Sequence, residues 1–82
     1  MKIVLTEQFD KSLSEAPIII QKTFWKQADF LSQNIRHPSL RAKKYDESRN
    51  IWQARVNQDW RFYFAISRNS YILLDIIPHP KF

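Results

Sequence analysis

The clearest alternation of hydrophobic and polar positions runs from residue 51 to residue 66. In the segment 60–66 every second side chain is apolar, as in a β-strand with one face in a core: Trp60, Phe62, Phe64 and Ile66. The segment 51–56 alternates in the same way, with Trp52, Ala54 and Val56 facing inwards. The polar run 57–59 between them has the length of a hairpin turn. These two segments are therefore predicted to form a β-hairpin with one buried face and one open face.

Two other segments have the composition of strands. Residues 2–5 are a short run rich in β-branched residues, and residues 71–77 are a longer apolar run. The turn 68–70 precedes the second run, and Asn69 is the residue expected there at positive φ. Asp75 is the one charge in the second run and should face outwards, and His79 shares its parity.

Residues 6–35 have the pattern of two helices. Thr6 suits an N-cap, and the spacing of Phe9 and Leu13 gives the first helix one apolar stripe. Pro17 ends that helix and can open the next. In the second helix apolar residues recur at the helical period, at Ile20, Phe24, Ala28, Leu31 and Ile35. The helix should stop at His37, because a residue that precedes a proline is pushed out of the α region.

This order of elements predicts an α+β fold, β-α-α-β-β-β, formed by residues 1–82 as a single domain. A small antiparallel β-sheet with an N-terminal strand would carry the helical hairpin on one face. Four apolar side chains lie beside the main stripe of the second helix: Ile18, Ile19, Trp25 and Phe30. A wide core-facing surface accounts for Ile19 and Phe30, whereas Trp25 is equally suited to anchoring a partner protein.

Composition excludes several classes of site. The chain has no cysteine, so it has neither disulfides nor a thiolate zinc site, and it has no glycine, so glycine-rich phosphate loops are absent. The apolar run at residues 3–5 is too short for a signal peptide, and no stretch approaches the length of a membrane span. We therefore expect a cytoplasmic protein with no small-molecule cofactor and no membrane partner.

The net charge of +5 comes entirely from the second part of the chain. Residues 1–35 hold four Lys against four acidic residues, whereas residues 36–82 hold nine Lys or Arg against four acidic residues. Such an asymmetry favours a polyanionic partner for residues 36–82, and the alternative is ordinary solubilising charge.

The open face of the predicted sheet carries candidate chemistry. Strand parity places Arg55, Arg61, Asp75 and His79 on this face. Guanidinium groups bind phosphate oxygens in pairs and keep their charge, and an imidazole exchanges protons near neutral pH. There are plainer alternatives: Arg61 and Asp75 can form a cross-strand ion pair, and His79 can be an ordinary terminal residue. We expect His37 to be a helix-end residue rather than a catalyst.

Four segments together resemble the RelE/ParE toxin superfamily, and the resemblance covers essentially the whole chain. They are HPSLRAKK (37–44), WQARVN (52–57), DWRF (59–62) and LLDIIPH (73–79). RelE- and YoeB-type members cleave mRNA on the ribosome, and ParE-type members poison DNA gyrase. The resemblance thus implies the toxin of a type II toxin–antitoxin system, a metal-independent mRNA endonuclease whose partners are a cognate antitoxin and the ribosome with bound mRNA. The alternatives are a ParE-like gyrase inhibitor and an inactive RelE-fold domain that binds only antitoxin or RNA.

The resemblance also implies roles for individual residues. Arg61 matches the phosphate-stabilising arginine, Arg55 matches a lysine of RelE, His79 lies near the catalytic histidine of YoeB- and YafQ-like members, and Lys81 corresponds to a terminal basic residue. The residues expected to bind RNA are Arg41, Lys43, Lys44, Arg49 and Gln53, the last in place of a second basic residue. No acidic residue aligns with a general base, and Phe82 stands near the terminal tyrosine of RelE-like proteins.

Overall fold

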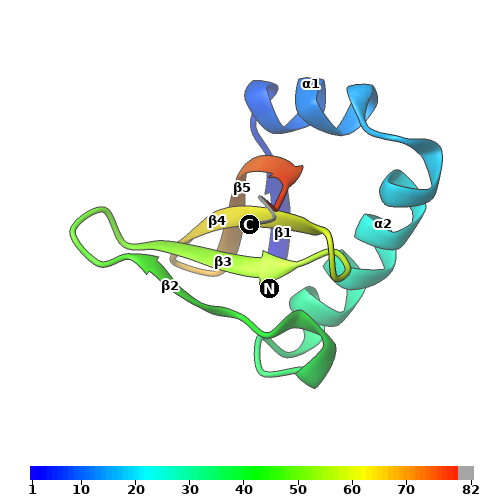
Figure 1. Ribbon diagram of the computed structural model, residues 1–82. Helices are drawn as coiled ribbons and strands as arrows, with labels where there is room; N and C mark the ends of the chain where they lie inside the picture. The colour runs from blue at the N-terminus through cyan, green and yellow to red at the C-terminus, as the bar shows by residue number, and fades with distance from the viewer. Residues whose placement is uncertain (80–82) are drawn as a thin grey trace.

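A computed structural model of the chain describes residues 1–79. The elements follow the order β1 (Lys2–Leu5), α1 (Glu7–Glu15), α2 (Ile18–Gln33), the short 3-10 helix η1 (Pro38–Leu40), β2 (Lys43–Asp46), β3 (Ile51–Arg55), β4 (Trp60–Ser67) and β5 (Ser70–Pro78). The strands form one five-stranded sheet in the order β1-β5-β4-β3-β2, and α1 and α2 lie to one side of it (Figure 1). The predicted α+β fold with a helical hairpin on a sheet is confirmed. None of the helices within residues 1–79 is both long and apolar enough to cross a membrane.

Two details of the sheet differ from the prediction. The strand β1 runs parallel to β5, so the sheet is mixed rather than wholly antiparallel. The connection after α2 also contains an additional edge strand, β2, which pairs antiparallel with β3. The sequence Lys-Lys-Tyr-Asp of β2 has no apolar alternation, because backbone pairing at an edge requires no buried side chains.

The β3–β4 hairpin forms as predicted and fixes the register of the site. The amide of Val56 donates to the carbonyl of Trp60 at 3.0 Å, and the Asn57 side chain accepts from the amides of Asp59 and Trp60, each at 2.9 Å. An asparagine that caps its own turn in this way is a common turn device. The resulting register places Arg55 directly opposite Arg61.

Strand β5 reverses the face of its side chains at a β-bulge. Tyr63 pairs with Asp75 and Phe64 pairs with Leu73, so Leu74 is an extra residue in β5. Both Leu73 and Ile76 are therefore buried although their parity differs. At the other end of β5, Arg68 and not Asn69 has positive φ, so the prediction for that turn is wrong by one residue.

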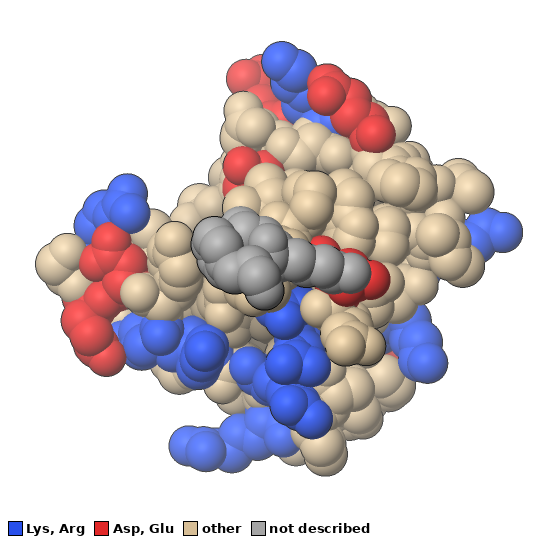
Figure 2. All heavy atoms as spheres, viewed as in Figure 1, with Lys and Arg blue, Asp and Glu red and all other residues tan. Residues whose placement is uncertain are grey.

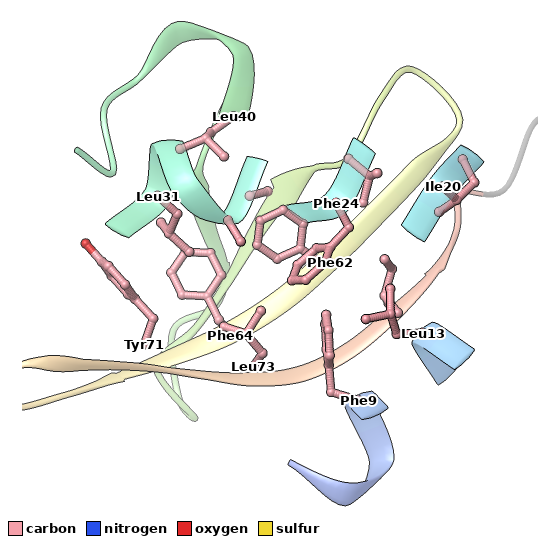
Figure 3. Close-up of a cluster of buried hydrophobic side chains, with 14 of the residues drawn as sticks. Phe9, Leu13, Ile20, Phe24, Leu31, Leu40, Phe62, Phe64, Tyr71 and Leu73 are labelled. Atoms are coloured by element: carbon pink, nitrogen blue, oxygen red, sulfur yellow. The ribbon is translucent and has the colours of Figure 1, made fainter. Parts of the chain in front are cut away.

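The helices pack against the sheet through the predicted stripes. Thr6 caps α1 by accepting a hydrogen bond from the amide of Phe9. The ring of Phe24 on α2 lies 4.9 Å from that of Phe9 on α1 and 5.4 Å from that of Phe62 on β4, and all three side chains are fully buried. Figure 3 shows this aromatic cluster between the helices and the sheet. Burial of each such ring contributes about 1.5–3 kcal/mol, which holds the sheet rigid beneath its open face.

Candidate functional site

A basic pocket of about 310 Å³ lies on the open face of the sheet. Figure 2 shows Lys and Arg side chains gathered below the centre of the view, where Figure 1 places β3 and the connection into β2. The pocket brings together six of the nine predicted site residues and Ala54, and its lining is Arg41, Lys43, Gln53, Ala54, Arg55, Arg61 and His79. We call this site the basic pocket.

Three parts of the fold bring these side chains together. Lys43 of β2 pairs with Gln53 of β3, and two residues further along β3 Arg55 pairs with Arg61 of β4. Arg41 directly follows η1, has a left-handed backbone φ of 45°, and precedes the first residue of β2 by two positions. The amide of His79 donates to the carbonyl of Asp59 at 2.7 Å, which fixes the end of β5 beside the hairpin turn.

Arg61 is held differently from the prediction. It lies on the expected side of the sheet, but only 6% of it is exposed, so the prediction of an open guanidinium is wrong. Its Nη1 donates to the carbonyls of Asn57, Gln58 and Trp60 at 2.8, 3.1 and 3.0 Å, because the hairpin turn curls over the side chain. Within residues 1–79 its Nε and Nη2 have no hydrogen-bond partner, and no side-chain nitrogen or oxygen is both buried and unpaired. One side of the guanidinium is thus anchored and the other remains available to a ligand.

The pocket has an excess of positive charge. Burial, and then the nearby charge of Arg55, lower the pKa of the Arg61 guanidinium from its ordinary value, although a guanidinium stays charged at pH 7. In the described part of the chain the ion pairs are Lys44–Glu47 and Arg49–Asp46, and neither uses a cation of the pocket. An anion with several oxygens would relieve the mutual repulsion of these cations and would also use the free guanidinium edge.

Gln53 also departs from the prediction of an exposed RNA contact. It is 9% exposed, and its side-chain amide donates to the hydroxyl of Tyr63 at 3.0 Å. Its amide nitrogen is therefore already engaged, and it forms part of the pocket floor. The aromatic ring of Tyr63 in turn contacts that of Tyr45 at 4.8 Å.

Two of the predicted residues within residues 1–79, Lys44 and Arg49, do not line the basic pocket. Lys44 lies 5.3 Å above the ring of Trp52 and 3.7 Å from Glu47, away from the pocket. Arg49 donates from Nε to Asp46 at 2.7 Å, and this bond with those from Ser48 and the Arg49 amide lowers the pKa of Asp46 to about 2. Lys81 lies outside the described residues.

The alternative roles considered for Arg61 and His37 are also resolved by geometry. The carboxylate of Asp75 accepts a hydrogen bond from the amide of Ile76 at 2.9 Å, and within residues 1–79 it forms no ion pair with Arg61. His37 lies at the N-terminal end of η1, where its Nδ1 accepts from the amide of Ser39, and its ring stacks on Phe30 at 3.8 Å. His37 is thus a helix-end residue as expected, but of η1 rather than of α2.

Sequence reasoning missed Gln27, which supports the pocket from behind. It is 4% exposed, and its amide donates to the carbonyls of Arg55 at 2.9 Å and Ser39 at 3.2 Å. Its oxygen accepts from the Ser39 hydroxyl at 3.2 Å, so one side chain joins α2, η1 and β3. The available signal was helical spacing, because Gln27 lies three residues after Phe24 and four before Leu31 and therefore faces the core.

No protein-family model and no curated protein matches this sequence. Solved structures do match it over nearly the whole chain. The YoeB/ParE toxin from Agrobacterium tumefaciens has a TM-score of 0.78 at 11% identity, with 98% of this chain and 100% of that chain covered. A chain of the archaeal RelE–RelB complex from Pyrococcus horikoshii has a TM-score of 0.77 at 17% identity, with 94% of this chain and 92% of that chain covered. A chain of the heterotetrameric YoeB–YefM toxin–antitoxin complex from Staphylococcus aureus has a TM-score of 0.76 at 12% identity, with 98% of each chain covered.

The chain has the RelE/ParE toxin fold. At these identities the backbone arrangement is shared although few side chains are. The RelE/ParE fold therefore accounts for the sheet order and the helical hairpin. The chemistry of the basic pocket has to be argued from the residues that line it.

Proposed function

We propose that this chain is the toxin of a type II toxin–antitoxin system and that it cleaves mRNA on the ribosome without a metal ion. The observation that carries this proposal is the buried, half-anchored Arg61 in a pocket with three further cations and, among its described lining residues, no carboxylate. Such a pocket suits a phosphodiester, because its charge and its free guanidinium edge match phosphate oxygens. The fold is that of solved RelE and YoeB toxins.

The proposed reaction is attack of a ribose 2′-oxygen on the adjacent phosphorus, with rupture of the bond from phosphorus to the 5′-oxygen. Negative charge grows on the phosphoryl oxygens as the phosphorane forms, so a fixed cation there lowers the barrier. Arg61 is the main candidate because its Nη1 is held by backbone carbonyls before any substrate arrives. Arg55, directly opposite on β3, adds a second guanidinium to the same phosphate.

His79 is the proposed proton-transfer residue. It lines the pocket, and its backbone is tied to the hairpin turn that also holds Arg61. An imidazole can remove the proton of the 2′-hydroxyl or protonate the leaving 5′-oxygen at physiological pH. Lys81 remains a predicted further basic contact. Arg41 and Lys43 are proposed to hold neighbouring phosphates of the mRNA.

The proposed partners are a cognate antitoxin and the ribosome with its bound mRNA, which places the protein in the cytoplasm. Structures with the same fold include a RelB–RelE antitoxin–toxin complex from Methanococcus jannaschii and the YoeB–YefM complex. An antitoxin that covers the basic pocket would neutralise the positive charge of the pocket and would prevent RNA from entering it.

The proposal is tested by expressing the protein in bacteria and mapping the 5′ ends of host mRNAs. We expect growth arrest, with new 5′ ends inside translated reading frames and none in untranslated RNA. The soluble Arg61→Ala variant should produce neither effect. Arrest by the wild type without new mRNA ends would reject the endonuclease assignment.

A ParE-like gyrase inhibitor is the second candidate function. It is favoured by one observation: with no carboxylate among the described lining residues, proton transfer in the basic pocket would depend on His79 alone. A protein that only binds its target needs no proton transfer. Trapping of gyrase on cleaved DNA by the purified chain, with mRNA left intact on ribosomes, would establish this function instead.

A further inference from the structure

We infer that Tyr45 and Tyr63 form a stacking platform for an unpaired RNA base beside the basic pocket. This inference rests on the proposed function and adds a subsite to it. The two rings meet edge to face, with centroids 4.8 Å apart and an interplanar angle of 67°. Aromatic side chains next to a basic groove are the usual means by which proteins hold bases of single-stranded nucleic acid.

The tyrosine pair is connected to the pocket through a direct chain of contacts. Gln53 lines the pocket and donates to the Tyr63 hydroxyl at 3.0 Å, and Tyr63 contacts Tyr45. Lys43 also lines the pocket and precedes Tyr45 by two residues on β2, a separation of about 7 Å along a strand. A nucleotide whose phosphate enters the pocket can therefore place a neighbouring base over the tyrosine pair.

Within residues 1–79, packing against the core does not explain the exposure of Tyr45. It is 58% exposed, whereas the aromatic side chains of the core are buried. It lies at the register shift between Lys44 and Asp46 in the edge strand, a β-bulge of the kind that often redirects a side chain beside a functional site. A tyrosine that served only the core would point to the other face of the sheet.

The segment that follows Tyr45 holds the bulge in place. The carboxylate of Asp46 accepts hydrogen bonds from the Ser48 hydroxyl, the Arg49 amide and the Arg49 guanidinium at 2.8, 3.2 and 2.7 Å. This clamp explains why Arg49 does not line the pocket. It also fixes the backbone next to Tyr45, so that less conformational freedom is lost when a base stacks on the ring.

The partner is RNA rather than a protein because of the charge around the platform. The four cations of the adjacent pocket, Arg41, Lys43, Arg55 and Arg61, form none of the ion pairs within residues 1–79. A single-stranded nucleic acid supplies both the phosphates for these cations and the bases for the rings.

The test measures binding of the full chain to a short, labelled, single-stranded oligoribonucleotide by fluorescence anisotropy. Loss of one stacked base should weaken binding about 5- to 150-fold, so Tyr45→Ala should show a decrease in this range and Tyr45→Phe should bind like wild type. Trp25→Ala is the matched control, because Trp25 is also half exposed, at 50%, but lies on α2. In a series of oligonucleotides that each lack one base, we expect one position at which loss of the base weakens binding to wild type but not to Tyr45→Ala.

The outcomes separate this inference from the proposed function. Wild-type affinity in Tyr45→Ala, with affinity lost in Lys43→Glu, would overturn the platform and leave the phosphate pocket standing. No affinity of the wild type for the oligonucleotide would overturn the platform, whereas the proposed function is decided separately by cleavage of mRNA on ribosomes. Loss of antitoxin binding without loss of RNA binding in Tyr45→Ala would also overturn the platform, since the pair would then be a protein contact.

Discussion

Replacement of Arg61 by lysine tests whether its guanidinium has two roles, anchoring to the hairpin turn through Nη1 and binding a phosphate through Nε and Nη2. The structure gives Nη1 three backbone acceptors and leaves Nε and Nη2 for a ligand. A lysine ammonium keeps the charge, but it is a single donor group and cannot both anchor to the turn and bind a phosphate with paired bonds. Arg61→Lys should therefore lose most of the activity although the net charge is unchanged.

The expected losses of cleavage rate and of stability follow from the two roles of the guanidinium, phosphate binding and anchoring to the turn. Loss of one preorganised contact to the transition state lowers the rate about 10²- to 10³-fold. Loss of the anchoring bonds should lower the free energy of unfolding by about 1–2 kcal/mol, because the turn carbonyls can regain water. Both Arg61→Lys and Arg61→Ala should thus be folded but slow.

The assay is single-turnover cleavage of mRNA on programmed ribosomes, with urea unfolding of the same preparations. Lys11→Ala is the control for charge, since it removes an exposed cation from α1, none of whose residues lines the basic pocket. A cleavage rate for Arg61→Lys within a few-fold of wild type would refute the reasoning. It would show that positive charge at this position is sufficient and that the geometry of the guanidinium is not used.

Three further predictions use matched positions in the chain. Lys43→Glu should weaken RNA binding and reduce its salt dependence, whereas Lys44→Glu should not, because Lys43 lines the basic pocket and Lys44 lies over Trp52; equal effects in a salt titration would contradict this. His79→Gln should slow cleavage about 10²- to 10⁴-fold, with antitoxin binding unchanged; a cleavage rate equal to that of wild type would exclude His79. Asp46 has its pKa lowered from 3.8 to about 2, so its contribution to stability should be complete above pH 4 and lost as the pH falls through about 2. Urea unfolding of wild type and Asp46→Asn should accordingly differ by a constant amount from pH 5 to 7 and converge in strong acid.

The hairpin and the helices were predictable because their signals are local. Period-two alternation in β4 and the period of 3.6 residues in α2 each require only one face of one element to be buried. The strand β2 could not be found in this way, since its residues are polar and its pairing uses the backbone. The β-bulge at Leu74 could not be predicted from the sequence either. It keeps both Leu73 and Ile76 in the core by breaking the alternation that sequence reasoning assumes.

For the site, parity correctly placed Arg55, Arg61 and His79 on one side of the sheet. What parity could not give was the burial of Arg61, which depends on carbonyls that become available only when the hairpin turn closes. Which Lys and Arg side chains line the pocket also depends on tertiary contacts that are not visible in the sequence. Lys43 lines the pocket, whereas its neighbour Lys44 packs over an aromatic ring on the other face.

The most direct test of the central claim is to incubate purified protein with programmed ribosomes and examine the ends of the mRNA fragments. The proposed reaction predicts cleavage of the ribosome-bound mRNA, with a 2′,3′-cyclic phosphate on the upstream fragment and a 5′-hydroxyl on the downstream fragment. The same mRNA without ribosomes should remain intact. Intact mRNA on ribosomes, from a preparation that arrests growth when expressed, would contradict the account.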